Sequence, residues 1–532
     1  MFRLSRTFPK RRQVNSGAAG QDTPEWQDLG LSDSLDKNIK MLKDTFANCS
    51  DIVFRQFALA QNEDIRLALI YTEGLTDKNQ VGDQIMRTLS LELPAVISGE
   101  RIKKERALEL IKQRGLCIHK INETNRMEKV VDAILSGDTV LLVDGHATAI
   151  INGSRGWAAR AVEDSVIDRL VRGPREAFVE TLGTNTSLLR RKIKNPSLKI
   201  ETTKIGRVTR TDVAVAYIQG IANPKIVEEL RRRLAKIDID GILESGYIEE
   251  LIEDNPLSPF CTINHTDRVD KVAAFLLEGR VAVMVDGTPN VMSVPALFIE
   301  LFHNPEDYYQ RYIFSSAIRM LRIITFFLTL LTPALYVAFT TYHPELLPTS
   351  LLLSVAGQRE AVPFPAFVEV LIMELTFEIL REAGIRMPQP MGQALSIVGA
   401  LVIGEAAVRA GMVAPATVIV VAVTGIASFT FCYTATITLR LIRFPLLLIS
   451  GTLGLYGLGA GLFVLTIHVV GLRSFGVPFL SPLAPLSVEG LKDTAVRAPW
   501  WAMFTRPALL GGKNIQRESP GLKPDPPQKR RK

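Results

Sequence analysis

Apolar and charged residues are mixed through the first 310 residues and then give way to long apolar runs. Residues 323–342 contain no charge, and residues 413–438 and 444–472 are two further charge-free stretches. A helix needs about twenty consecutive apolar residues to cross a bilayer. The pattern therefore predicts a cytosolic N-terminal half followed by an all-α polytopic membrane domain over residues 311–475.

The membrane domain is expected to have about five transmembrane helices. The expected spans are residues 323–342, 365–380, 390–408, 413–438 and 444–472. Residues 345–362 are short and interrupted by polar side chains, so we expect them to be interfacial or re-entrant.

Charge near the spans predicts their orientation. Arg311, Arg319 and Arg322 precede the first span, and positive residues favour the cytosolic side of a membrane. The N-terminal half is therefore expected in the cytosol. Five crossings would place the C-terminal tail outside, which disagrees with its basic end, and a crossing by residues 345–362 would remove this conflict.

The N-terminal half contains a duplication. Residues 125–145 align without a gap with residues 267–287, and residues 68–75 resemble residues 214–221 in the same order. In each copy a short apolar run precedes two stretches of helical periodicity and a buried strand that ends in Asp-Gly, a turn signal. We infer two tandem α/β modules, at roughly residues 50–160 and 197–300.

The predicted fold class is thus an α/β tandem-repeat cytosolic domain plus an all-α polytopic membrane domain. The expected parts are a basic disordered arm (1–30), α/β module 1 (31–160), a linker with α/β module 2 (161–310), the transmembrane helical domain (311–475) and a C-terminal tail, disordered at its end (476–532).

Composition argues against an enzyme. The four cysteines form no CxxC pair, so we expect free thiols and no metal site. Phosphate-binding, zinc-protease and nucleophile-elbow motifs do not occur, and turn geometry suffices to explain Asp144 and Asp286. No catalytic residue and no cofactor is predicted.

The net charge of +7 comes largely from the basic ends of the chain. Membrane lipid is a more fitting partner for these ends than nucleic acid. Ends that only keep the protein soluble are the simpler alternative.

Charged residues lie inside one apolar stretch. Glu369, Glu374, Glu378 and Arg381 form a predicted intramembrane charge cluster, with the last three on one helix face. A charge at the bilayer centre costs roughly 2.5–3.5 kcal/mol, so these groups must face protein or water. They belong either to an ion path or to an interhelical ion-pair lock with Arg381 or Arg386.

The stretch 390–408 carries the candidate gate. Val398, Leu401 and Glu405 share one face, and an apolar ring beside an acidic ring would make a hydrophobic gate next to a cation-attracting mouth. Core packing is the simpler explanation and is favoured by periodicity alone.

Several long segments resemble one family. PEDYYQR (305–311), ELIEDNPLSPF (250–260) and the run EILREAGIRMPQPMGQ within residues 362–408 are similar to the spore germination A-subunit family of endospore-forming bacteria. The resemblance covers about residues 35–510. Cys261 and Val269 stand where the family usually has proline, which affects loop detail in module 2 only.

The resemblance implies a multi-pass subunit of a spore germinant receptor in the spore inner membrane. Its implied partners are a membrane-embedded B subunit that binds the nutrient, a lipoprotein C subunit and further copies of itself, as a pentameric homo-oligomer that opens as a cation channel. It also implies that residues 390–408 line the pore, which favours a gating role for Leu401 and Glu405.

Two alternatives remain. The protein could be an ion-release amplifier like the stage V sporulation AF protein, or a non-conducting scaffold for the nutrient-binding subunit.

Overall fold

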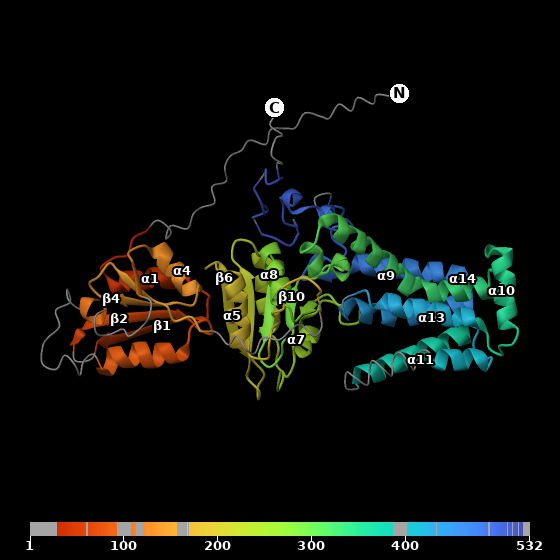
Figure 1. The fold of residues 1–532 in the computed structure, drawn as a ribbon, viewed down its shortest axis with the longest axis horizontal. Coiled ribbons are helices and arrows are strands. Elements are labelled where there is room, and N and C mark those ends of the chain that lie inside the picture. Colours follow the sequence, from red (N-terminus) through yellow and green to blue (C-terminus); the bar gives the residue numbers. More distant parts are fainter. Residues whose placement is uncertain are drawn as a thin grey trace, which may run out of the picture. The chain divides into compact units, whose positions relative to one another are not determined.

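A computed structural model describes most of the chain. The described residues are 29–59, 62–92, 108–112, 121–156, 168, 170–386, 402–431, 433–487, 490–507, 509–512, 514–519 and 521–524. The chain divides into two compact units, Met1–Trp157 with Lys194–Pro196, and Ala158–Ile193 with Ser197–Lys532. Each unit contains one five-stranded sheet, and the second unit also contains the long apolar helices (Figure 1).

The first sheet is antiparallel throughout, with strand order β1-β2-β4-β5-β3. Its strands are β1 (Ile52–Leu59), β2 (Asn62–Thr72), β3 (Ile121–Thr124), β4 (Thr139–Val143) and β5 (Ala149–Asn152). Helices α1 (Leu35–Thr45) and α4 (Met127–Leu135) pack on one face, and η1 (Gln80–Met86) and η2 (Thr88–Glu92) on the other. Because strand side chains alternate between faces, β2 supplies apolar residues to both layers.

The second sheet repeats this arrangement, with strand order β6-β7-β9-β10-β8. Its strands are β6 (Leu198–Ile205), β7 (Thr211–Ile218), β8 (Asn264–Thr266), β9 (Val281–Val285) and β10 (Val291–Val294). Helices α5 (Leu182–Lys192) and α8 (Val269–Glu278) cover one face, while α6 (Pro224–Leu234) and α7 (Ser245–Ile252) pack on the other. The repeated strand order confirms the duplication expected from the sequence.

Matching hydrogen bonds extend the repeat upstream. Asp144 Oδ1 accepts the first N–H of α1 at 3.3 Å, and Asp286 Oδ1 accepts the first N–H of α5 at 2.9 Å. The amide of Asn38 pairs with the backbone of Ser32, and Asn185 pairs in the same way with Val179. The segment expected to link the modules therefore contains α5, which belongs to module 2. Asp144 and Asp286, the aspartates of the two Asp-Gly turns, each hold the start of one helix in place.

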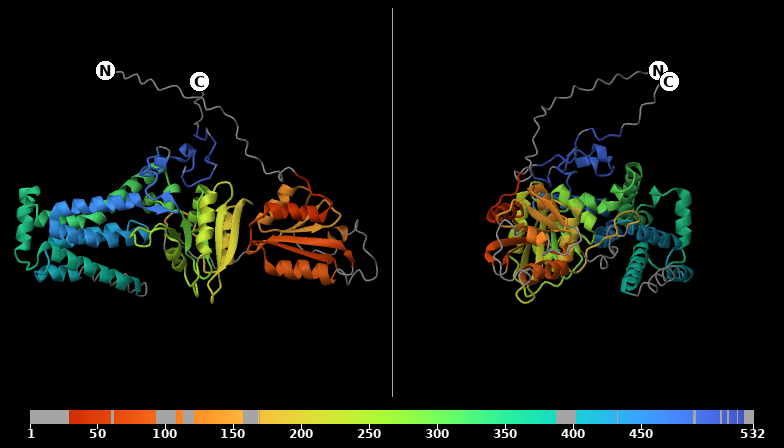
Figure 2. Two further views of the ribbon diagram at one scale, coloured as in Figure 1. Left: turned by 180° about the vertical axis from the view of Figure 1, so that it is seen from behind. Right: turned by 60° about the vertical axis from the view of Figure 1, so that its left-hand side comes forward.

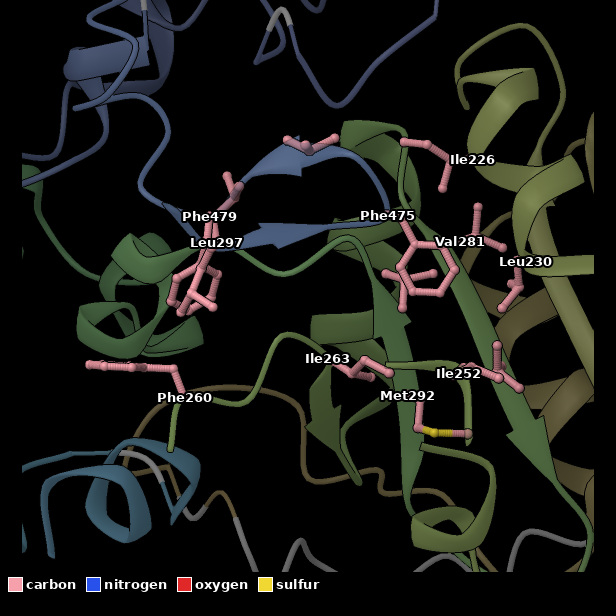
Figure 3. Close-up of a cluster of buried hydrophobic side chains, with 14 of the residues drawn as sticks. Ile226, Leu230, Ile252, Phe260, Ile263, Val281, Met292, Leu297, Phe475 and Phe479 are labelled. Atoms are coloured by element: carbon pink, nitrogen blue, oxygen red, sulfur yellow. The ribbon is translucent and has the colours of Figure 1, made fainter. Parts of the chain in front are cut away.

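The end of the helical domain completes the core of module 2. Strands β11 (Arg473–Ser474) and β12 (Val477–Pro478) form a short hairpin. Figure 3 shows Phe475 of this hairpin beside Val281, and Phe479 beside Leu297. Phe479 O also accepts a hydrogen bond from Phe298 N at 2.8 Å. The chain therefore returns to module 2 after the last long helix.

The helical domain consists of long helices that lie side by side (Figures 1 and 2). They are α9 (Tyr312–Thr341), α11 (Ala366–Arg386), α13 (Pro415–Ser428) and α14 (Tyr433–Gly471), with the short α10 (Thr349–Arg359) between α9 and α11. Within the described residues, Tyr312–Thr341 and Ala435–Gly471 are long and apolar enough to span a membrane, and α13 is a shorter apolar helix.

Helix α14 is a hairpin of two legs. Gly454 has φ 60° and ψ −143°, which no residue within a helix adopts. A Cβ built on Gly461 would lie 2.9 Å from Leu446 Cδ2, whereas residues fifteen apart on a straight helix are separated by about 22 Å. Residues 433–453 and 455–471 therefore run antiparallel to each other.

Successive helices run alternately away from module 2 and back toward it. Tyr342, just after α9, donates to Gly451 O at 2.8 Å, far from module 2, while His468 near the end of α14 lies 2.9 Å from Ser258 of module 2. Thr430, after α13, contacts Thr325 in the first half of α9 at 2.8 Å. The passes are α9, α11, the helix at 402–409, α13 and the two legs of α14.

This arrangement differs from the expected five spans. The stretch 444–472 contains a turn at Gly454 and passes twice, and residues 349–359 form α10 and make no pass. Charge-free sequence alone does not mark a turn between two apolar helices, which explains the difference.

Candidate functional site

A cluster of charged side chains joins α11 to α14. Arg443 of α14 lies 2.7 Å from Glu374 and 3.1 Å from Glu378, both on α11. Glu378 also pairs with Arg440 of α14 and accepts two hydrogen bonds from Arg381 at 2.8 and 2.9 Å. The structure thus brings together three of the four residues expected in an intramembrane charge cluster.

The buried position of this cluster favours a lock between helices. The side chains of Arg443 and Glu374 are 3% and 1% exposed. Such a pair is stable only if opposite charges compensate the loss of hydration. Arg386, one of the two expected partners, pairs with Glu382 at 2.7 Å on the surface, and Arg381 bonds within its own helix. The interhelical partners are therefore Arg440 and Arg443.

Glu369 belongs to a different site. Its carboxylate accepts hydrogen bonds from Ala414 N at 3.0 Å and Thr417 Oγ1 at 3.1 Å, and Arg359 Nε lies 3.2 Å away. Ala414 precedes α13, so the fully buried carboxylate sits at the positive end of that helix. Glu369 therefore ties α11 to α13 and to the end of α10.

The candidate gate is only partly described. Val398 and Leu401 lie outside the described residues, and Glu405 lies on the helical segment 402–409. Glu405 and Arg409 form an ion pair at 57% and 79% side-chain exposure. Val402, Glu405 and Arg409 are spaced by three and four residues and are all exposed, so one outer face of this helix carries charge.

A second buried network connects module 2, α9 and the tail. Arg322 donates to both carboxylate oxygens of Asp307 at 2.8 Å. Arg319 is fully buried. Its Nε lies 3.3 Å from Asp307 Oδ2 and its Nη1 lies 2.8 Å from Asp493 Oδ1. Two of the three arginines expected to mark the cytosolic boundary therefore point into the protein.

A cavity of about 130 Å³ lies near this network, lined in part by Glu278, Arg280, Glu300 and His303. Burial lowers the pKa of His303 well below its ordinary value and raises the pKa of Glu278. His303 is therefore neutral at neutral pH. The positive charge beside Glu278 and Glu300 is that of the Arg280 guanidinium, which forms an ion pair with each of them.

The sequence contained a signal for the interhelical lock. Arg440 and Arg443 are three residues apart, and Glu374 and Glu378 are four apart on another apolar helix. Both spacings place the charges on one helix face, so the sequence indicates a charged face on each helix, and the fold selects which faces meet.

The chain matches the model of the Bacillus/Clostridium GerA spore germination protein family over residues 40–509. The chain belongs to this family. It is an A-subunit spore germination protein and a membrane protein, and the family is not an enzyme family.

Relatives of this GerA-family protein match it over most of their length. It is 46% identical over 497 residues to spore germination protein KA of Bacillus subtilis, covering 93% of this chain and 90% of that protein. It is 44% identical over 499 residues to the uncharacterized membrane protein YfkQ of Bacillus subtilis, covering 93% and 95%.

One solved structure is also similar, the crystal structure of the N-terminal domain of the A subunit of the Bacillus megaterium spore germinant receptor GerK3. It is 39% identical to this chain with a TM-score of 0.40, and the match covers 51% of this chain and 98% of that one.

Proposed function

We propose that this GerA-family protein is the channel-forming subunit of a germinant receptor. In this proposal five copies assemble in the spore inner membrane around a cation pore, and a nutrient-binding B subunit and a lipoprotein C subunit complete the complex. Nutrient binding to the B subunit would open the pore.

The exposed charged face at 402–409 supports this proposal. Glu405 and Arg409 lie on the outside of the helix bundle, on a segment that packs between α11 and α13. Charges at this position would be costly against lipid and must face water or protein. A pore between identical copies would expose these side chains to water and would place the Glu405 side chain of each copy around the pore axis.

The position of the gate follows from Glu405. Leu401 precedes Glu405 by one helical turn, so five leucines would converge beside five carboxylates if the helix continued through both residues. An apolar constriction of this kind stays dry when narrow and fills with water when it widens. Val398 would extend the apolar ring by about one further turn.

The buried locks would form the fixed part of the channel. The contacts of Arg443 and of Glu369 hold α11 against α14 and α13, and α11 and α13 are the helices that flank the segment 402–409. With the flanking helices held in place, a small displacement of the pore-lining helix would open the gate.

We also propose six membrane crossings with both chain ends in the cytosol. The start of α9 and the end of α14 both lie at module 2, which supports an even number of crossings. The charge conflict raised by five spans is removed because α14 turns at Gly454.

Potassium efflux from spores tests the channel. We expect Leu401→Ala spores to leak cations and lose dormancy without nutrient, because a smaller side chain weakens the dry barrier. Glu405→Gln should leave the protein level unchanged and slow cation release. Glu382→Gln is the matched control, since Glu382 and Arg386 form another exposed pair four residues apart, and it should release cations normally.

Other outcomes would support other functions. Normal dormancy and normal efflux in Leu401→Ala spores at normal protein level would contradict the gate and favour a scaffold. Cation release that does not depend on any B subunit would indicate an amplifier instead of a nutrient-gated receptor.

A further inference from the structure

The beginning of α9 has an apolar outer face and a charged inner face. Ile313, Met320 and Leu321 are 69%, 45% and 50% exposed, while Arg319 and Arg322 point inward to Asp307 and Asp493. At 100° per residue these three apolar side chains share one side of the helix with Ile324 and Phe327. The outer face is therefore apolar from the first turn of α9 onward.

The length of α9 exceeds the hydrocarbon thickness of a membrane. Its 30 residues extend for about 45 Å at a rise of about 1.5 Å per residue. A bilayer has a hydrocarbon core of about 30 Å and measures about 40–45 Å with its headgroup layers. Tyr312 and Tyr342, each 41% exposed, lie at the two ends, as is typical of interfacial aromatic residues.

The tail adds an aromatic residue at the level of the first turns of α9. Arg497 N donates to Ser316 Oγ at 3.1 Å, and Trp500 Nε1 donates to Tyr308 O at 3.3 Å. Trp500 is 43% exposed. Tryptophan is enriched where membranes meet water, because its ring is apolar and its N–H is polar.

We propose that these elements form an interfacial surface that lies in the cytosolic phospholipid headgroup layer. The surface consists of Ile313, Met320 and Leu321 of α9 and Trp500 of the tail. The membrane boundary then lies near Tyr312, about three turns before the charge-free stretch begins.

Phospholipid is the expected occupant because the apolar face continues without interruption into the spanning part of the same helix, which exposes Ile324 and Phe327. The arginines of this segment are already paired inside the protein, so none needs to face the lipid. The exposed Arg311 at the start of α9 can reach phosphate groups. This inference concerns membrane position and is independent of whether the protein conducts ions.

Spin-label accessibility tests the proposal in the full chain, reconstituted in phospholipid vesicles. Single cysteines replace Met320 and Leu321 in a background without native cysteines. We expect the spin labels at these two sites to collide frequently with oxygen. Their collisions with a water-soluble nickel complex should be several-fold rarer than those of a spin label at Val208→Cys, an exposed site on module 2. Phe327→Cys serves as the lipid-facing control.

Each other result overturns the proposal. Nickel accessibility equal to that of the Val208 site would place the surface in water. Low accessibility to both reagents would show that protein, such as a second copy, covers it. Independently, lipids brominated near the headgroup should quench tryptophan fluorescence less in Trp500→Phe, and unchanged quenching would exclude Trp500 from the surface.

Discussion

At the residue scale, Arg443 is the centre of the buried charge cluster. It contacts Glu374 and Glu378 on another helix, whereas Arg381, which the sequence suggested for this role, bonds only to Glu378 within α11 among the contacts described. Removing one partner of a buried pair leaves an uncompensated charge, which typically costs about 3–5 kcal/mol.

We therefore expect Arg443→Ala to reduce the amount of folded protein in membranes strongly. Arg443→Lys should have a smaller effect, because lysine keeps the positive charge beside both carboxylates. Some loss should remain, because an ammonium group is more strongly hydrated than a guanidinium and costs more to bury. Adding Glu374→Gln to Arg443→Ala should restore part of the loss. Protein level and thermal stability in detergent provide the measurement.

The control for this prediction is Arg386→Ala. Arg386 and Glu382 form an exposed pair, and such pairs contribute about 0–1 kcal/mol. An effect of Arg443→Ala no larger than that of Arg386→Ala would contradict the lock, and the acidic residues would then be candidates for an ion path.

At the element scale, the hairpin in α14 decides the topology of the chain. Its turn depends on Gly454, whose positive φ is strained for other residues. A Cβ at this position would also meet Tyr342 Cβ at 2.9 Å. The two legs bring the chain end back to module 2, which supports the proposed topology with the tail and module 2 on one side of the membrane.

Cysteine labelling in intact bacteria checks this topology. Tyr456 lies just after the turn and is 81% exposed, and Leu486 lies in the tail and is 70% exposed. In a background without native cysteines, we expect a membrane-impermeant maleimide to label Tyr456→Cys in intact cells. It should label Leu486→Cys only after permeabilisation. Labelling of Leu486→Cys in intact cells would place the tail outside and refute six crossings.

At the scale of the whole molecule, the membrane domain and module 2 share one core. Phe475 lies beside Val281 of the sheet of module 2 and Phe479 lies beside Leu297, and both are far from these partners in sequence (Figure 3). Burying a phenylalanine contributes about 1.5–3 kcal/mol. The N-terminal half is still expected to fold by itself, since both sheets have helices on both faces.

A fragment of residues 29–305 should therefore be soluble and melt cooperatively, with residual exposed apolar surface. Fusing residues 472–480 to its end through a flexible linker should raise the melting temperature by several degrees. The same fusion with Phe475→Ser and Phe479→Ser is the control and should give no increase. Equal melting temperatures for all three proteins would show that the hairpin adds nothing to module 2.

Sequence patterns predicted part of the N-terminal half, including two of the five strands in each sheet. The aligned segments 125–145 and 267–287 correspond to α4–β4 and α8–β9, because alternation and helical spacing are local properties. The sequence does not mark the upstream helices α1 and α5 as equivalent. Their equivalence rests on Asp144 and Asp286, which bond to helices 109 and 104 residues away.

The candidate site was predicted in part. The sequence showed that Glu374, Glu378 and Arg381 share a face, which follows from helical geometry. It did not show that Arg443 completes the cluster or that Glu369 binds the start of α13. Leu401 and Val398 remain predictions.

The sequence by itself determined the duplication, the division into an N-terminal α/β half and a helical membrane half, and the family, because these depend on composition and order along the chain. Tertiary structure decided which charges pair, that α14 turns back at Gly454, and that residues 473–479 complete module 2. These features join residues up to about two hundred positions apart, as in the contact of Ser258 with His468. No local pattern encodes such partners, since several helices offer faces of suitable size and charge and only packing of the whole chain selects among them.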